Sequence, residues 1–150
     1  MTDIKSAKDR SRNMAAIRSK DTTPEVYIRK LLFSRKYRYR KNVSYTPGHP
    51  DLFLRKFNLA VFVHGCFWHR HRDCKYAYMP RSREDFWQKK FDQNIVRDAE
   101  VLKELDEQGI RCLIIWECTI KAMRKDKEVE ESVMTTIDDF IQCGGEYLEI

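Results

Sequence analysis

The sequence predicts a mixed α/β domain in which a small central β-sheet is flanked by helices. Helical segments with one apolar face alternate along the chain with short apolar runs of strand length. Residues 51–54 and 59–63 are two such runs joined by a short turn, which favours an antiparallel hairpin. A long helical segment then separates residues 59–63 from the apolar run 111–116, so this strand pair is expected to be parallel.

The composition is that of a globular protein with one core. A chain of 150 residues with 42% hydrophobic and 35% charged residues can fold as a single domain, and we assign it to residues 21–150. No apolar run is long enough to span a bilayer, and the N-terminus lacks the apolar stretch of a signal peptide. We therefore expect a cytosolic protein without a membrane partner. In the cytosol, five cysteines indicate thiols or metal ligands rather than disulfides.

The net charge of +6 is unevenly distributed. Residues 1–20 carry six Lys/Arg against two Asp, and residues 126–150 carry one Lys against eight Asp/Glu. The first 125 residues are therefore strongly basic. This charge suggests a polyanionic partner, with nucleic acid as the first candidate, although solubility alone would also explain it. Residues 1–20 are predicted to be a flexible basic arm with one helical turn, which either follows a DNA groove or is a frayed terminus.

The first helix of the domain is predicted over residues 24–36. Thr23 can cap it, Pro24 suits its first position, and Glu25 favours the positive end of the helix dipole. The residues expected to face inward are Ile28, Leu31 and Leu32. Glu25 has two interpretations: an ordinary first-turn acid, or an acid that reaches a metal or a water molecule in a nearby site.

The predicted hairpin makes Asp51 a candidate site residue. Alternating residues 37–40 predict a strand, and a loop with two prolines leads from there to the hairpin. Asp51 opens the first hairpin strand, so it should lie near Val63 and His64 at the end of the second.

The second half of the chain predicts helix, strand and helix. Residues 82–85 resemble a capping box that starts a helix running to Gln108, where Gly109 ends it. Its expected apolar stripe consists of Phe86, Ile95, Ala99, Leu102 and Leu105. Residues 111–116 predict a buried strand, with Cys118 just past its end. The last helix is expected over residues 127–142, closed by Gly144 and Gly145, with an inner face of Val129, Val133, Ile137 and Phe140.

Residues 61–74 concentrate the metal-binding side chains, because three of the four histidines and two of the five cysteines lie there. A closed structural zinc site needs four soft ligands. This loop supplies Cys66, His71 and Cys74, and the fourth is expected from Cys118, whose strand should neighbour residues 59–63. His69 competes as a ligand, Cys112 and Cys143 are better explained as core and surface residues, and unrelated thiols are the alternative.

Four polar candidates remain once zinc has its ligands: Asp51, His64, His69 and Glu25. A carboxylate at the hairpin end can bind Mg²⁺, and a neutral histidine can deprotonate water that attacks a phosphodiester. Phe67 and Trp68 lie in a polar loop, where they either wedge between bases or cap the zinc site. Trp87 either joins them or packs in the core.

These segments together closely resemble the very short patch repair endonucleases, the Vsr-type mismatch nicking enzymes, from about residue 8 to about residue 142. The residues that carry the resemblance are Arg12-Asn13-Met14, residues 48–53, residues 62–69, His71 with Cys74, Phe86-Trp87, Asn94 with Arg97-Asp98, and residues 116–118. The run His64-Gly65-Cys66-Phe67-Trp68-His69 is the most specific of them.

The resemblance implies a bacterial enzyme with a restriction-endonuclease-like core that nicks double-stranded DNA 5′ to the thymine of a T:G mismatch left by deamination of 5-methylcytosine. It implies a functional link to a cytosine-5 DNA methyltransferase and, as candidate partners, mismatch-repair factors; a monomer is the default. The implied roles are Mg²⁺ binding by Asp51 and the backbone of Val63, general base catalysis by His69 with His64 and Glu25 assisting, structural zinc at Cys66, His71, Cys74 and Cys118, a DNA wedge of Phe67, Trp68 and Trp87, and a DNA-gripping arm with Arg12, Asn13 and Met14.

Two positions depart from the family pattern. Val63 stands where the family has threonine, and one extra residue separates His71 from Cys74. The family itself lacks the Glu-x-Lys of its superfamily, so histidine chemistry replaces the lysine. Two other functions remain open: a zinc-stabilised module that binds mismatched DNA without cutting it, and a nuclease of the same fold that serves a restriction system.

Overall fold

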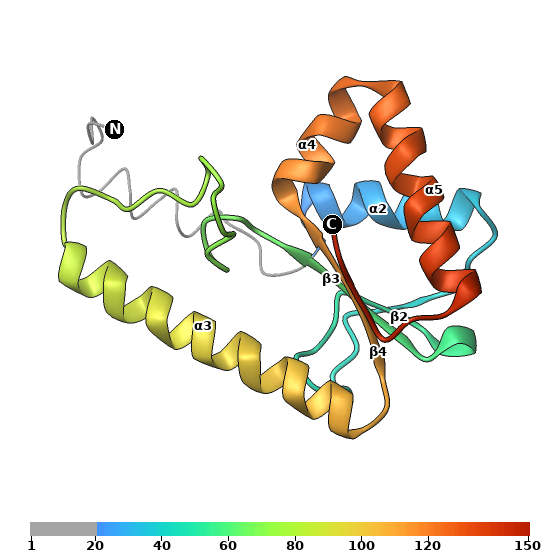
Figure 1. Ribbon diagram of the computed structural model, residues 1–150, viewed down its shortest axis with the longest axis horizontal. Helices are drawn as coiled ribbons and strands as arrows, with labels where there is room; N and C mark the ends of the chain where they lie inside the picture. Colours follow the sequence, from blue (N-terminus) through green and yellow to red (C-terminus); the bar gives the residue numbers. More distant parts are fainter. Residues whose placement is uncertain (1–20) are drawn as a thin grey trace.

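The computed structural model describes residues 21–150, so the predicted arm and its residues Arg12, Asn13 and Met14 lie outside the described part of the chain. Over that part, helices lie on both faces of a five-stranded sheet with the strand order β1-β2-β3-β4-β5. Helices α2, α4 and α5 cover one face and α3 runs along the other (Figure 1). The predicted α/β class with a small mixed sheet is confirmed.

The sheet combines antiparallel and parallel strands as the sequence predicts. Strands β1 (Arg40–Lys41), β2 (Leu52–Leu54) and β3 (Leu59–His64) pair antiparallel in chain order. Strand β3 pairs parallel with β4 (Arg111–Trp116), and β4 pairs parallel with β5 (Tyr147–Glu149). The parallel register places His64 opposite Trp116. Strands β3 and β4 therefore end side by side, and the segments that follow them begin at the same edge of the sheet.

Four helices complete the described fold: α2 (Thr23–Ser34), α3 (Glu84–Glu107), α4 (Glu117–Lys125) and α5 (Lys127–Cys143). A short 3-10 turn, Arg55–Phe57, connects β2 to β3, and Asn58 ends it in the left-handed conformation. None of the helices in residues 21–150 has the length and apolarity needed to cross a membrane.

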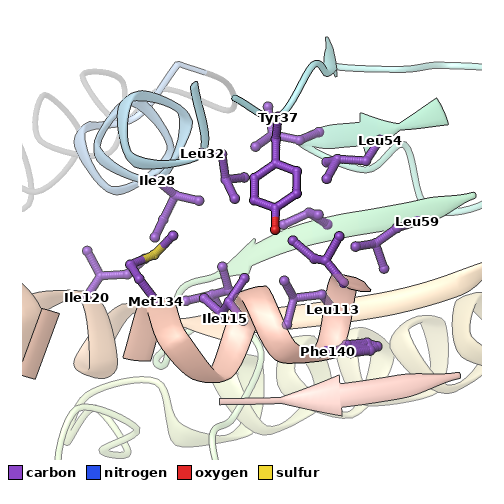
Figure 2. Close-up of a cluster of buried hydrophobic side chains, with 14 of the residues drawn as sticks. Ile28, Leu32, Tyr37, Leu54, Leu59, Leu113, Ile115, Ile120, Met134 and Phe140 are labelled. Carbon is purple, nitrogen blue, oxygen red and sulfur yellow. The ribbon is translucent and has the colours of Figure 1, made fainter. Parts of the chain in front are cut away.

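The core is divided between the two faces of the sheet because successive strand residues point to opposite sides. Leu59, Val61, Leu113 and Ile115 face α2, α4 and α5 in the larger cluster, part of which Figure 2 shows. Ala60, Phe62, Cys112 and Ile114 belong to the smaller cluster, which Leu105 of α3 closes. Each fully buried Leu or Ile contributes roughly 1.5–3 kcal/mol, so the larger cluster supplies most of the apolar stabilisation.

The predicted start of the first helix is wrong by one residue. Thr22, not Thr23, is the N-cap, and its hydroxyl accepts a hydrogen bond from the Glu25 N–H at 3.4 Å. Thr23 and Pro24 are then the first two helical residues. The strand predicted over residues 37–40 shrinks to Arg40–Lys41, because Tyr37 is instead buried against the helices.

The predicted cap of the long helix is wrong, and its predicted apolar stripe is correct only for Leu105 and, in part, for Leu102. The N-cap residue of α3 is Arg83, with a φ of 59°, and its side chain makes no capping hydrogen bond. Phe86 and Ile95 are about half exposed, at 47% and 49%. The buried residues of α3 are Phe91 and Leu105. The face of α3 that contacts the rest of the protein differs from the predicted apolar stripe because it includes the polar residues Asn94 and Asp98. A search for apolar residues at helical spacing cannot find these two positions.

Helix α4 and strand β5 were not predicted from the sequence. Cys118, expected just past a strand, lies in the first turn of α4. Gly144, expected to close the last helix, is the C-cap of α5, and the chain then continues into β5. The expected inner face of α5 is correct for Ile137 and Phe140, whereas Val129 and Val133 are only partly buried against the core.

Two glycines with positive φ allow a matched test of packing beside the hairpin. A Cβ on Gly48 (φ +79°) would lie 2.5 Å from Val101 and 3.0 Å from Phe62, whereas a Cβ on Gly109 (φ +69°) would meet nothing within 4 Å. Both alanine variants carry the left-handed strain of about 1–2 kcal/mol. We expect Gly48→Ala to lose about 1–3 kcal/mol more because of overpacking, measured as the urea midpoint at unchanged m-value. Equal losses would contradict this packing constraint.

Candidate active site and metal centre

Asp51 lies where the antiparallel hairpin predicts it. It immediately precedes β2, and its Oδ2 accepts a hydrogen bond from the Val63 N–H at 2.7 Å. Val63 is the next-to-last residue of β3, so this bond ties the carboxylate to the strand end from which the His-rich loop departs. The side chain is therefore held by backbone geometry rather than by a flexible loop.

The surroundings of Asp51 stabilise its protonated form relative to a free carboxyl in the absence of a cation. Burial is the largest cause, and the negative charge of Glu25 adds to it, so the pKa of Asp51 rises to about 7. The Val63 N–H and His69 partly oppose this shift. Glu25 is only 6% exposed and accepts a hydrogen bond from the Asp21 N–H at 2.8 Å. A divalent cation would stabilise two carboxylates that lie this close together. Mg²⁺ prefers oxygen ligands and is therefore a suitable ion for this site.

His69 is held by an acid from the long helix. Its Nδ1 lies 2.7 Å from Oδ2 of Asp98. A carboxylate on Nδ1 favours the tautomer that carries the proton there, which leaves Nε2 as the basic nitrogen. The pair therefore has the geometry of an oriented histidine base.

His64 stacks directly on His69, with ring centroids 3.8 Å apart and planes 3° apart. Burial, together with the neighbouring His69, lowers the pKa of His64 to about 3. His64 therefore stays neutral near pH 7, and its ring restricts rotation of His69.

Asp98 is a residue that no local pattern singled out; it appeared only within the resemblance. The helix positions Trp87, Phe91, Asn94 and Asp98 follow one another at spacings of four, three and four, so they share one face of α3. Asn94 donates a hydrogen bond to the Trp68 carbonyl at 2.9 Å. The signal was present in the sequence as a helical stripe, but half of its members are polar.

Four soft donors meet where β3 and β4 end. The ligand atoms of Cys66, His71, Cys74 and Cys118 all lie within 4.8 Å of one another. Nδ1 of His71 is 3.6 Å from Sγ of Cys66 and 3.4 Å from Sγ of Cys118. Tetrahedral bonds of about 2.3 Å to sulfur and 2.0 Å to nitrogen would space ligands roughly 3.5–3.8 Å apart. The donor set therefore fits a zinc ion.

The other metal-ligand candidates lie elsewhere. Nδ1 of His69 is taken by Asp98, and Cys112 is buried in β4 while Cys143 is exposed at the end of α5. Burial raises the pKa of the Cys66 thiol to about 12 in the metal-free chain. A cation is thus needed to hold Cys66 as a thiolate near neutral pH.

The aromatic residues form a partly exposed cluster beside His69. Phe67 contacts Trp68 and Trp87 with centroids 5.0 and 5.5 Å apart, and Trp87 lies 5.6 Å from the buried Phe91. Trp116 stacks on His71 at 4.1 Å. Trp116 is therefore the aromatic residue that stacks on the metal-ligand cluster, whereas the rings of Phe67 and Trp68 contact other aromatic residues. Neither Phe67, Trp68 nor Trp87 is fully buried, so each keeps surface available for stacking.

Comparison with known proteins gives the same family in two ways. A family model described as DNA mismatch endonuclease Vsr matches residues 2–76. The chain is 34% identical to the DNA mismatch endonuclease Vsr of Escherichia coli K12 over 144 residues, which are 96% of this chain and 90% of that protein. It is 44% identical to the type II nicking enzyme V.NmeAIP of Neisseria meningitidis, over 81% of this chain and 86% of that enzyme. The type II nicking enzyme V.XorIIP of Xanthomonas oryzae is 40% identical over 80% of this chain and 88% of its own length.

The raised pKa of Asp51 predicts a specific pH dependence of stability. Native Asp51 keeps its proton up to about pH 7, whereas the free carboxyl loses it near 3.8, so the native state binds more protons between these values. The free energy of unfolding therefore falls as the pH rises through this window. The asparagine of an Asp51→Asn variant cannot titrate, yet its carbonyl can accept the Val63 hydrogen bond. Going from pH 5 to pH 8 without Mg²⁺, we expect Asp51→Asn to gain on the order of 2 kcal/mol relative to wild type.

Urea unfolding at the two pH values measures this difference, and the zinc ligands titrate alike in both proteins and cancel. The exposed Asp139 of α5 offers the matched control Asp139→Asn. If the free energies of unfolding of wild type and Asp51→Asn changed equally with pH, the raised pKa of Asp51 would be contradicted.

Proposed function

Because this chain belongs to the Vsr family of DNA mismatch endonucleases and related nicking enzymes, we propose that it nicks double-stranded DNA 5′ to the thymine of a T:G mismatch. Its class as an endonuclease acting on DNA follows from the family itself. The family has a restriction-endonuclease-like core, and the mixed five-stranded sheet flanked by helices is that architecture. The mismatch, the strand and the metal requirement are the proposed part.

The observation that carries the proposal is the pairing of an acidic metal-binding corner with an oriented histidine. Glu25 is buried and the partly buried Asp51 lies close to it, and His69 is close enough to affect the charge on Asp51. Asp98 holds His69 from the other side. Hydrolysis of a phosphodiester needs a base for the attacking water and positive charge for the developing oxyanion, and these two groups supply the base and the cation site.

The mechanism assigns each side chain one task. Asp51, with the backbone of Val63, would hold Mg²⁺, which when bound supplies positive charge beside the scissile phosphate. His69 accepts the proton of the attacking water at Nε2, and Asp98 stabilises the resulting imidazolium. His64 stays neutral against the ring of His69 and assists by fixing its orientation. Glu25 supports the acidic corner at the helix start.

The same loop supports the recognition step. We assign Phe67, Trp68 and Trp87 to a wedge that enters the base stack beside the mismatch, at a cost of a few kcal/mol for unstacking one step. Val63 has a methyl group where the family's threonine has a hydroxyl, so a role of its backbone is unaffected while any role of the hydroxyl is lost. Arg12, Asn13 and Met14, assigned to the DNA-gripping arm, precede the described residues.

Zinc is proposed as the structural cofactor of this loop. Cys66, His71 and Cys74 would hold it from the loop and Cys118 from the first turn of α4, which clamps the two segments that follow β3 and β4. The extra residue between His71 and Cys74 is accommodated without loss of a ligand atom from the cluster. Sites of this type contribute on the order of 10 kcal/mol to folding.

The biological setting is also part of the proposal. Mismatches from deaminated 5-methylcytosine arise only where a cytosine-5 DNA methyltransferase has acted, so we expect a functional link to such an enzyme. Repair of the bacterial nucleoid would take place in the cytoplasm. We expect the protein to act as a monomer, with mismatch-repair factors as candidate partners. Several relatives are named type II nicking enzymes, which favours single-strand cutting over a non-catalytic binding module. The same names are also compatible with the alternative function, a nuclease of this fold that serves a restriction system.

The central prediction concerns nicking of a duplex with one T:G pair, placed in several cytosine-methyltransferase contexts, in the presence of Mg²⁺. Wild type should cut beside the thymine, and Asp51→Asn and His69→Ala should each be slower by about 10²–10⁴-fold. Binding of the duplex should persist in both variants, and Asp139→Asn should cut like wild type. Binding by zinc-loaded wild type without cutting in any context would instead favour the non-catalytic module.

A second prediction concerns the metal content of protein purified without added metal. We expect about one zinc per chain for wild type and for Cys143→Ser, since Cys143 is exposed and outside the cluster. Cys74→Ser and Cys118→Ser should lose zinc, with a melting temperature lowered by more than about 10 °C. Elemental analysis and thermal unfolding provide the readouts, and a folded, monodisperse wild type free of zinc would disprove the assignment.

A further inference from the structure

Arg70 lies between His69 and His71, yet none of the proposed tasks uses it. Its backbone is in the left-handed region, with φ 52°. Its side chain does not extend into solvent but turns back under the loop. Nη1 donates to the carbonyls of Phe67 and Tyr78, both at 3.1 Å, and Nη2 donates to the Ala77 carbonyl at 2.7 Å. One guanidinium therefore joins two parts of the loop that lie on either side of the proposed zinc ligands His71 and Cys74.

The flat face of the same guanidinium rests on the long helix. Its central carbon lies 3.8 Å from the ring centroid of Phe91 and 5.7 Å from that of Phe67. Phe91 is only 1% exposed, so this contact is a fixed support within α3. Arg70 thus connects the loop to the helix directly beneath the aromatic cluster.

The contacts of Arg70 and Asn94 enclose the aromatic pair from both ends. Arg70 holds the Phe67 carbonyl, and Asn94 holds the Trp68 carbonyl. The ring of Phe67 also contacts Tyr78, whose carbonyl Arg70 binds and whose side chain is 44% exposed. With their carbonyls fixed, Phe67 and Trp68 have little backbone freedom.

Removing a guanidinium partly from water costs free energy, which the three hydrogen bonds of Arg70 offset. A planar fork is the side chain that can reach three carbonyls and stack on a ring at the same time, which a lysine cannot do. The groups that Arg70 holds are those assigned to the DNA wedge.

We propose that Arg70 is the positioning residue of the aromatic wedge, which locks Phe67 and Trp68 for insertion into the base stack before DNA binds. This inference rests on the proposed function. A wedge that is already ordered loses little conformational entropy on binding, so more of the contact energy remains to unstack the bases. Because His69 follows Trp68 directly, the same clamp also fixes the catalytic histidine relative to the inserted rings.

The test compares Arg70→Met and Arg70→Lys with the matched control Arg72→Met. The methionine of Arg70→Met keeps an apolar stem on Phe91 and loses all three hydrogen bonds, whereas the lysine of Arg70→Lys keeps the charge but can bridge fewer carbonyls. Arg72 is exposed in the same loop, so Arg72→Met removes one positive charge without disturbing the clamp. Each protein is first shown to be folded and to carry the same zinc content as wild type.

The first readout uses free protein and does not depend on the proposed function. Trp116 is only 6% exposed, so acrylamide quenching of tryptophan fluorescence mainly reports Trp68 and Trp87. We expect stronger quenching in Arg70→Met than in wild type or Arg72→Met. Unchanged quenching in a folded Arg70→Met would overturn the clamp.

The second readout uses a T:G duplex with 2-aminopurine beside the mismatch, whose fluorescence rises when its base step unstacks. We expect Arg70→Met to bind within a few-fold of wild type, to give a smaller fluorescence rise, and to nick about 10–100-fold more slowly in single turnover, since small misplacements of reacting groups have effects of this size. Arg70→Lys should show most of this defect, and should replace Arg70→Met if that variant fails to fold.

The outcomes separate the two proposals. A wild type that neither unstacks nor nicks any T:G duplex would overturn the proposed function, while the quenching result would still decide whether Arg70 orders the rings. A wild type that unstacks and nicks, alongside Arg70 variants that do both equally well, would overturn the positioning role alone.

Discussion

The parallel pairing of β3 with β4 is the constraint on which the functional end of the molecule depends. Its register places His64 beside Trp116, so both strands end at the same level of the sheet. The loop after β3 carries Cys66, and the helix after β4 begins with Glu117 and Cys118. Six paired positions, most of them with buried side chains, fix this level, because a slip of one residue would move every side chain of one strand to the opposite face of the sheet.

The same strand end separates two kinds of metal chemistry. Sulfur and imidazole donors gather on the loop that follows β3, and carboxylates gather where the hairpin brings Asp51 back to Val63. Soft ligands suit zinc and hard oxygen ligands suit Mg²⁺, so the two proposed ions need not compete. The site raises the pKa of Asp51 and lowers that of His64. Such perturbed pKa values are typical of a functional site rather than of a core that only stabilises the fold.

Helix α3 acts mainly as a support for the loop. Its C-terminal end packs on the sheet through Leu105, while Phe91, Asn94 and Asp98 meet the loop. These three contacts hold, in turn, the Arg70 guanidinium, the Trp68 carbonyl and the His69 ring. A single helix thus fixes the aromatic cluster and the histidine relative to each other.

The sequence alone determined the features that depend on local pattern. Apolar runs and a short turn predicted the hairpin, the long helical crossover predicted the parallel pair, and soft donors at short spacing predicted the metal cluster, because each signal comes from neighbouring residues. The tertiary structure decided what depends on distant contacts. Asp98 became the partner of His69 only when α3 was placed against the loop, and β5 formed because β4 offered it an edge. Arg70 has no sequence signal at all: only the folded loop brings three carbonyls and the Phe91 ring within reach of one guanidinium.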